Sequence, residues 1–315
     1  MIYLYLRNIK TTTCAFTVLL TLSSASFAQT CSVSMGNMVF GSINTLAGGA
    51  VDTTATMTII CSGGQAQGQR LCISLGAGSA SDATSRKMTS GANSARYDLY
   101  SNSSRTTLWG SWETGYDSAG LQLDVTRGST TNVTVYGRFL AAQQTVPAGS
   151  YTATFTANPF VRYGNKQGAP SCPTGGLTAT ASFSATATVL STCNVGATAV
   201  NFGSAGVLSS NTDAQGTLSI QCSASLPYTV SLDGGNSAAT DPTQRKMSFS
   251  GANVIYGLYR DSARSLPWGS TVGTNTTSST GTGVTQTQTV YGRVGAQTTP
   301  APGAYSDSVV VTVGY

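Results

Sequence analysis

The chain has 315 residues, of which 16 are basic and 11 acidic, and its formal net charge is +5. The small positive excess is scattered, and charged residues make up only 9% of the sequence, which argues against a nucleic-acid partner. The chain has no histidine, so it offers no plausible Ser–His–Asp triad; its only glutamate is Glu113, and no pair of carboxylates recurs or clusters with motif-like spacing. We therefore expect neither an enzyme nor a metal or cofactor site.

Residues 1–28 have the features of a secretory signal peptide. Arg7 and Lys10 precede an apolar run over 15–22, and Ser-Phe-Ala at 26–28 predicts cleavage after Ala28. The apolar run is too short to span a bilayer, and no later stretch is a candidate. We expect an exported protein without a membrane span, whose mature chain keeps 14 basic and 11 acidic residues, a net charge of +3.

The mature sequence contains the same pattern twice, which predicts two domains. The order of the matching motifs is kept throughout. The matches are Phe40-Gly41 with Phe202-Gly203, Arg86-Lys87-Met88 with Arg245-Lys246-Met247, Tyr97-Asp98-Leu99-Tyr100 with Tyr256-Gly257-Leu258-Tyr259, Trp109-Gly110 with Trp268-Gly269, Val135-Tyr136-Gly137-Arg138 with Val290-Tyr291-Gly292-Arg293, and Gly149-Ser150-Tyr151 with Gly303-Ala304-Tyr305. The repeated Trp109, Arg138 and Arg293 are interpreted as framework residues.

Each copy is a series of short segments of alternating polarity, separated by Gly, Ser, Asn and Pro, without helical periodicity. This pattern predicts an all-β protein with two immunoglobulin-like β-sandwich domains in tandem. The strands expected in the first copy are 32–42, 53–61, 70–76, 95–101, 131–140 and 150–157, and those in the second are 194–204, 215–223, 227–233, 254–260, 286–295 and 304–314.

The segment 177–189 between the two copies alternates strictly, with Ser or Thr at every even position. Its expected inward residues are Leu177, Ala179, Ala181, Phe183, Ala185, Ala187 and Val189. We expect it to be the last strand of the N-terminal domain, 29–190, kept in cis. The second domain, 191–315, has no matching segment and is expected to lack its last strand, which leaves an apolar groove for a strand from another chain. Because only two residues precede Cys31 after cleavage, we expect a subunit that accepts a strand and donates none.

Six cysteines remain after cleavage, and an even number in an exported chain indicates disulfides. The repeat predicts Cys31–Cys61 and Cys193–Cys222, joining the first two strands of each copy. Cys72 and Cys172 have no counterparts in the second copy, and we expect them to join the loops 62–71 and 158–176, although six cysteines allow fifteen pairings.

The motifs Tyr-x-Leu-Tyr at 97–100 and 256–259, Trp-Gly, Val-Tyr-Gly-Arg, Pro-x-Gly-x-Tyr at 147–151 and the terminal aromatic Tyr315 resemble the spore coat U domain family. The resemblance covers essentially the whole mature chain. It implies a subunit of archaic, Csu-type chaperone–usher pili, and the two-domain form is similar to tip adhesins. The partners it implies are a periplasmic chaperone, an outer-membrane usher, a next pilin that donates a strand to the second domain, and an abiotic or host surface. The implied location is the pilus tip at the cell surface, with a role in biofilm formation.

A binding surface is expected at the pole of the first domain farthest from the second. Because 177–189 must end at the domain junction, its start and the loop 158–176 are predicted to lie at that pole. The number of short strands between 76 and 131 decides whether 112–120 points the same way. Apolar residues found only in the first copy suggest a hydrophobic adhesive tip made of Trp112, Tyr116, Phe160, Val161 and Tyr163.

Other interpretations of these residues stay open. Phe160 and Tyr163 could pack beneath their own loop, and Asp117 and Arg162 could contact a glycan in a carbohydrate-binding tip. A non-adhesive fimbrial or spore-coat-like subunit is the remaining alternative. It would be expected to carry a donor strand at its mature N-terminus.

Overall fold

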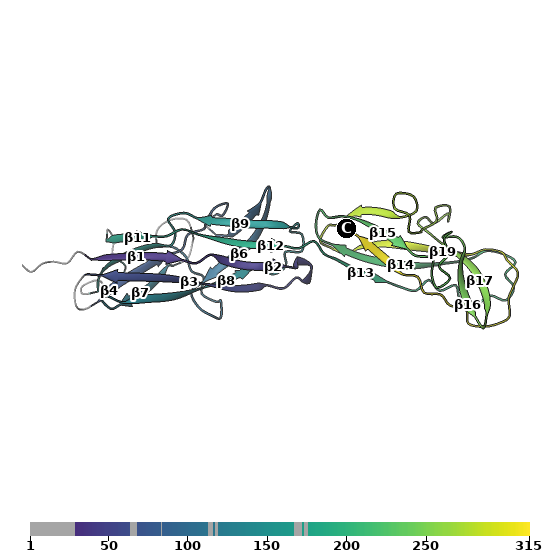
Figure 1. The fold of residues 1–315 in the computed structure, drawn as a ribbon, viewed down its shortest axis with the longest axis horizontal. Coiled ribbons are helices and arrows are strands. Elements are labelled where there is room, and N and C mark those ends of the chain that lie inside the picture. Colours follow the sequence, from purple (N-terminus) through teal and green to yellow (C-terminus); the bar gives the residue numbers. More distant parts are fainter. Residues whose placement is uncertain are drawn as a thin grey trace, which may run out of the picture.

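The computed structural model describes residues 29–63, 68–82, 84–112, 116, 119–166, 172 and 176–315. The predicted signal peptide, 1–28, lies outside the described residues, as do Glu113 and Asp117. Figure 1 shows two halves that follow each other end to end, each built from strands. We refer to them as domain one and domain two.

Domain one consists of two sheets that enclose one core. The eight-stranded sheet has the order β1 (Thr30–Met35), β3 (Val51–Ser62), β8 (Thr130–Phe139), β6 (Asn93–Tyr100), β5 (Arg86–Ser90), β9 (Gly149–Phe155), β12 (Phe183–Val189), β2 (Met38–Ile43). The four-stranded sheet has the order β11 (Leu177–Thr180), β10 (Phe160–Asn165), β4 (Gln69–Ser74), β7 (Leu121–Val125). A short 3-10 turn, Thr45–Ala47, follows β2.

Domain two repeats this plan with fewer strands. Its five-stranded sheet has the order β13 (Cys193–Ala197), β14 (Thr212–Cys222), β19 (Gln286–Val294), β17 (Ala252–Tyr259), β16 (Arg245–Phe249). Its three-stranded sheet has the order β18 (Thr277–Thr280), β15 (Pro227–Leu232), β20 (Val311–Gly314). Tandem immunoglobulin-like sandwiches, the second without its last strand, are the fold class that the sequence predicts.

Several expected strands differ in extent from the observed ones. The segment 32–42 forms two strands, β1 and β2, and most of 198–204 and 304–310 in domain two is irregular. The irregularity has a physical cause. In domain one β2 has β12 as its only neighbour in the sheet, and β9 also bonds to β12. Their counterparts in domain two have no such neighbour among the described residues, so their backbone groups form almost no ladder.

A fully buried arginine explains one of the repeated motifs. Arg86 donates hydrogen bonds to the carbonyl oxygens of Leu75, Gly76 and Trp109 at 2.6–3.0 Å. Arg245 is equally buried and bonds to the corresponding carbonyls in domain two, including that of Trp268 at 2.8 Å. Each guanidinium satisfies carbonyl groups from several loops at once, and burial lowers the pKa of both arginines.

The glycine of Val-Tyr-Gly-Arg is required by a close approach. A Cβ at Gly137 would lie 2.6 Å from Sδ of Met38 and 3.1 Å from the Phe40 ring, because β2 crosses over β8 there. Gly292 is covered in the same way by Val200 and Phe202. The motif therefore marks where the N-terminal segment of each domain returns across its sheet.

The described residues contain three disulfides, which are the pairs expected from the sequence: Cys31–Cys61, Cys72–Cys172 and Cys193–Cys222. The first and third join the opening strands of each domain in register. The second ties residue 172 to the outer face of β4, next to Gln122.

Replacing Arg86 with Met keeps the volume but leaves its carbonyl partners unsatisfied in the core. We expect Arg86→Met to lower the free energy of unfolding of domain one by about 3 kcal/mol. The control is Arg138→Met, since Arg138 pairs with Asp52 at a partly exposed site, and the expected loss is below about 1 kcal/mol. Urea denaturation of both variants under oxidising conditions measures the difference. Equal losses would contradict the role assigned to Arg86.

Candidate functional site

The strand β12 shows how a closed groove is built in this fold. It pairs antiparallel with β9, from Phe183 opposite Phe155 to Val189 opposite Gly149, and parallel with β2. Phe183, Ala185, Ala187 and Val189 point inward and are all buried. The strand β12 thus pairs with the backbone edges of both β9 and β2, and its inward side chains cover the apolar face between them.

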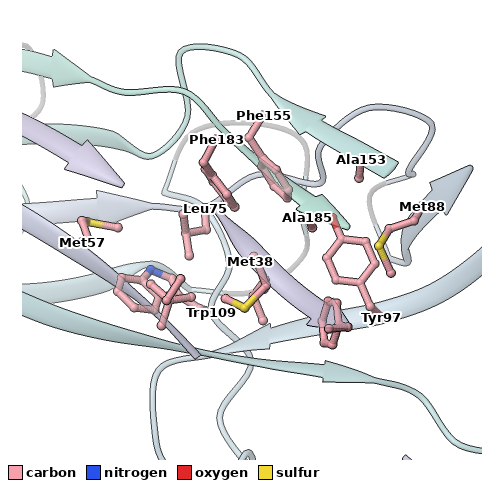
Figure 2. Close-up of a cluster of buried hydrophobic side chains, with 14 of the residues drawn as sticks. Met38, Met57, Leu75, Met88, Tyr97, Trp109, Ala153, Phe155, Phe183 and Ala185 are labelled. Carbon is pink, nitrogen blue, oxygen red and sulfur yellow. The ribbon is translucent and has the colours of Figure 1, made fainter. Parts of the chain in front are cut away.

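The side chains of β12 also fill the core of domain one. The ring of Phe183 stacks on that of Phe155, with centroids 4.2 Å apart and an interplanar angle of 10°. Figure 2 shows this pair next to Ala185, Ala153 and Met38. Ala185 and Ala153 are fully buried partners, so only small side chains meet at the middle of the groove.

The expectation of one strand over 177–189 is wrong in one respect. Residues Leu177–Thr180 form β11 in the four-stranded sheet, and the chain then crosses at Ala181 and Ser182 into the eight-stranded sheet. Because β11 is an edge strand, Leu177 is 50% exposed and is not a core residue. Both strands nevertheless remain in domain one.

Domain two has an open groove at the place that β12 occupies in domain one. The groove has a volume of 1050 Å³ and lies between residues 197–206 and 299–311. The repeat makes these two segments the counterparts of β2 and β9, because Phe40 matches Phe202 and Tyr151 matches Tyr305. No strand of the described chain lies between them.

The groove of domain two is mainly apolar. Its lining includes Val200, Phe202, Leu218, Leu258, Val290, Tyr305 and Val309. Tyr151 in domain one is 1% exposed, whereas its counterpart Tyr305 is only half-buried. An apolar groove with an unpaired strand edge is the kind of surface that binds an added β-strand.

The predicted adhesive residues do not form one surface. Val161 and Tyr163 point inward from β10 and are 0% and 5% exposed, and Tyr116 is 6% exposed. The prediction that these three residues belong to an exposed tip is therefore wrong. The start of the expected loop 158–176 is a strand, and its alternation turns Val161 and Tyr163 into the core.

Trp112 and Phe160 remain accessible. Trp112 is 45% exposed, its backbone N–H donates to Oγ of Ser74 at 2.9 Å, and its ring rests on the bare backbone of Gly120. Phe160 is half-buried and is the β10 residue opposite Ser74. Both aromatic residues thus lie on the outer face of the four-stranded sheet, on either side of Ser74. We call Trp112 and Phe160 the aromatic pair.

Tyr116 has an electrostatic role inside domain one. Its ring lies 3.8 Å from the guanidinium carbon of Arg86, and its hydroxyl donates to Asp98 at 2.7 Å. Burial raises the pKa of Asp98, and the hydrogen bond from Tyr116 and the charge of Arg86 oppose this rise. Burial likewise raises the pKa of Tyr116. This contact fixes residue 116 to the body of the domain, and Gly257 occupies the position of Asp98 in domain two.

The pole opposite the junction carries polar groups where the structure describes it. The loops expected there do meet: Asn165 pairs with Gln69, and the N–H of Lys166 donates to the Gly68 carbonyl at 3.2 Å. Asp124 accepts from Arg70 and Lys166, and the hydrogen bond from Arg70 is the main reason its pKa falls to about 2. The accessible predicted tip residues, Phe160 and Trp112, are not at these loops, because both lie next to Ser74, at the other end of β4 from Gln69.

The described residues contain no cluster of three His, Cys, Asp or Glu that could hold a metal ion. A helix with the length and hydropathy needed to cross a membrane is likewise not found in the described part of the chain.

A family model, the Spore Coat Protein U domain, matches residues 15–158 and 179–312. The chain belongs to this family. The first match ends before β10, and the second covers most of domain two together with the end of β11 and the whole of β12 from domain one. The segment between the matches contains β10 and the start of β11. No curated protein sequence gives a match.

Solved structures of pilus tip subunits are similar to this chain. One is the chaperone–tip adhesion subunit complex CsuC–CsuE from the archaic chaperone–usher Csu pili of Acinetobacter baumannii, with a TM-score of 0.52 and 19% identity, covering 91% of this chain and 100% of that one. Another is the CupB6 tip adhesin from Pseudomonas aeruginosa, with a TM-score of 0.39 and 12% identity, covering 90% and 93%. At this identity the first likeness shows the fold alone.

Truncating β12 at its buried end should destabilise domain one. We expect Phe183→Ala to cost about 3–4 kcal/mol, because it removes a stacked, buried ring and leaves a cavity. Leu177→Ala is the matched control from the same predicted strand, and it should change the free energy of unfolding by about 0.5 kcal/mol or less, since Leu177 is half exposed. Urea unfolding of both variants is the measurement, and a loss at Leu177 as large as that at Phe183 would contradict the strand crossing.

Proposed function

We propose that this protein is the adhesive tip subunit of a pilus assembled by the chaperone–usher pathway. The observation that carries this proposal is the difference between the two domains. Domain one keeps its closing strand β12 in cis, whereas domain two presents an open groove at the same place.

This difference determines which end of the subunit joins the fibre. In a fibre held together by strand addition, a domain whose groove is already filled has no place for a neighbour's strand. The subunit then joins the fibre through domain two, and domain one becomes the free end. The partners that follow are a periplasmic chaperone that covers the groove before assembly, an outer-membrane usher, and a next subunit whose strand replaces the chaperone. The Acinetobacter tip adhesion subunit forms a pre-assembly complex with its chaperone, which agrees with this arrangement.

Attachment would then depend on domain one at the pilus tip, outside the cell. The aromatic pair offers the apolar contact area, since each Å² of apolar surface buried against a partner contributes about 25 cal/mol. The guanidinium of Arg162 lies 5.7 Å from the centre of the Phe160 ring, so polar donors accompany the ring. Contact with an apolar surface and biofilm formation are the proposed outcome, and binding of a carbohydrate face is the second candidate, favoured by this aromatic–arginine neighbourhood.

A strand supplied in cis should stabilise domain two. We propose to append a copy of residues 183–190 after Tyr315, through a Gly/Ser linker as long as segment 166–182, which makes the same connection in domain one. The expected result is a higher unfolding temperature and greater protease resistance for domain two, because the added strand pairs with both edges of the groove. In the control, two inward residues of the appended copy, Ala187 and Val189, are changed to Asp. Equal unfolding temperatures and equal protease resistance of the two chains would contradict the proposal that the groove accepts a strand.

Removing the aromatic pair should reduce attachment without affecting assembly. We expect the double variant Trp112→Ser and Phe160→Ser to lower bacterial adhesion to polystyrene at least severalfold, with unchanged pilus number by electron microscopy. The matched control is Val207→Ser in domain two, which removes a residue that is 75% exposed. Retained adhesion in the double variant would exclude the aromatic pair, and loss of glycan binding with retained polystyrene binding would favour the carbohydrate interpretation.

A further inference from the structure

At the position of Ala153 in β9 the groove of domain two has a residue of different chemistry. Ala153 in β9 lies opposite Ala185 of β12, and both are fully buried. Counting two residues on from the matched tyrosines Tyr151 and Tyr305 places Asp307 at the position of Ala153. Asp307 lines the open groove of domain two and is half-buried there. An acidic residue thus stands where the closed groove of domain one has a methyl group.

The carboxylate of Asp307 is held in place by domain two itself. Its Oδ2 accepts from the hydroxyl of Tyr256 at 2.6 Å, and its Oδ1 accepts from the backbone N–H groups of Asn236 and Ser308, both at 2.8 Å. Gly235 lies so close to the carboxylate that a Cβ there would collide with it. In domain one the hydroxyl of Tyr97, the counterpart of Tyr256, is buried and has no hydrogen-bond partner among the described residues.

A strand that enters this groove removes water from Asp307. A carboxylate has about four lone-pair sites, and domain two supplies three donors, so one acceptor position loses its water when the groove closes. Burying a charged acceptor without a partner is costly, whereas a hydrogen bond to it stabilises the closed state. The register of β12 against β9 places the donor-strand counterpart of Ala185 opposite Asp307.

We infer that Asp307 selects the strand that completes domain two. The preferred strand carries a small hydrogen-bond donor, Ser, Thr or Asn, at the position equivalent to Ala185, between apolar inward residues. The residue must be small, because this position holds alanine against alanine in domain one. This inference rests on the proposed strand acceptance by domain two and names the chemistry of the partner's strand.

The same residue makes the chain's own closing strand a weaker partner for domain two than a strand with a small donor at this position, although its apolar inward residues still fit the groove. Ala185 would present a methyl group to the carboxylate of Asp307 in another copy of the protein. The groove therefore favours the strand of a different subunit over β12 of another copy of this protein. The apolar inward residues of the two competing strands can be the same, so the preference depends on the residue opposite Asp307.

The test compares peptides that differ by one oxygen atom. A peptide with the sequence of residues 181–191 and its Ala185→Ser version are labelled and titrated against the full mature chain. We expect the Ser peptide to bind about tenfold more tightly, the effect of one hydrogen bond to a charged group. A Thr186→Ser peptide, changed at an outward position, is the control and should bind like the parent. Against an Asp307→Ala chain the preference for Ser should disappear. The Asp307→Ala chain should fold, since domain one has alanine at the matching position, Ala153, and its matching tyrosine hydroxyl, that of Tyr97, also has no hydrogen-bond partner among the described residues.

The outcomes separate the two proposals. Equal affinity of the Ala and Ser peptides for the unmodified chain, or a preference for Ser that persists with Asp307→Ala, would overturn the role of Asp307 and leave strand acceptance intact. Failure of every peptide to bind the groove would overturn strand acceptance itself and the inference with it. Tighter binding of an Ala185→Lys peptide than of the Ser peptide would overturn the requirement for a small donor.

Discussion

The backbone pairing on both sides of β12 is the constraint on which the rest of this molecule depends. A β-sandwich needs a partner for every buried strand edge, and in domain one β12 provides it for β9 and β2 together. Where this strand is absent, the counterpart of β2 is irregular, and Tyr305 is only half-buried and lines the groove. One strand therefore accounts for the difference between the closed domain one and the open groove of domain two.

Around this difference the two domains share the same internal supports. The buried arginines Arg86 and Arg245 bind equivalent carbonyl groups, and the indole N–H groups of Trp109 and Trp268 donate to the carbonyls of Ile73 and Val230. These supports reach the strands beside the groove, since Arg86 lies on β5, the neighbour of β9, and Arg245 lies on β16, the counterpart of β5. They tie the loops and strands of domain two together around the open groove.

Sequence patterns predicted the framework better than the surface. The repeat located both domains, and Trp109 is a framework residue, as expected. By contrast, the occurrence of Val161 and Tyr163 in only one copy suggests a tip, yet both residues belong to a strand of the second sheet. The strand β10 is short, with two adjacent apolar residues before Arg162 and a Gly after Tyr163, so its alternation is too weak to distinguish it from a loop. Its inward face becomes visible only in the pairing of β10 with β4.

The sequence by itself determined the duplication, the all-β class, the two repeated cysteine pairs and the alternating segment that separates the copies, because these features are local or recur at matched positions. Only the tertiary structure decided that this segment crosses between two sheets, that Tyr116 is fixed by Asp98 and Arg86, and that Asp307 faces the groove of domain two. These facts depend on which distant strands become neighbours. Neighbouring strands are chosen by packing over the whole domain, which no single segment encodes.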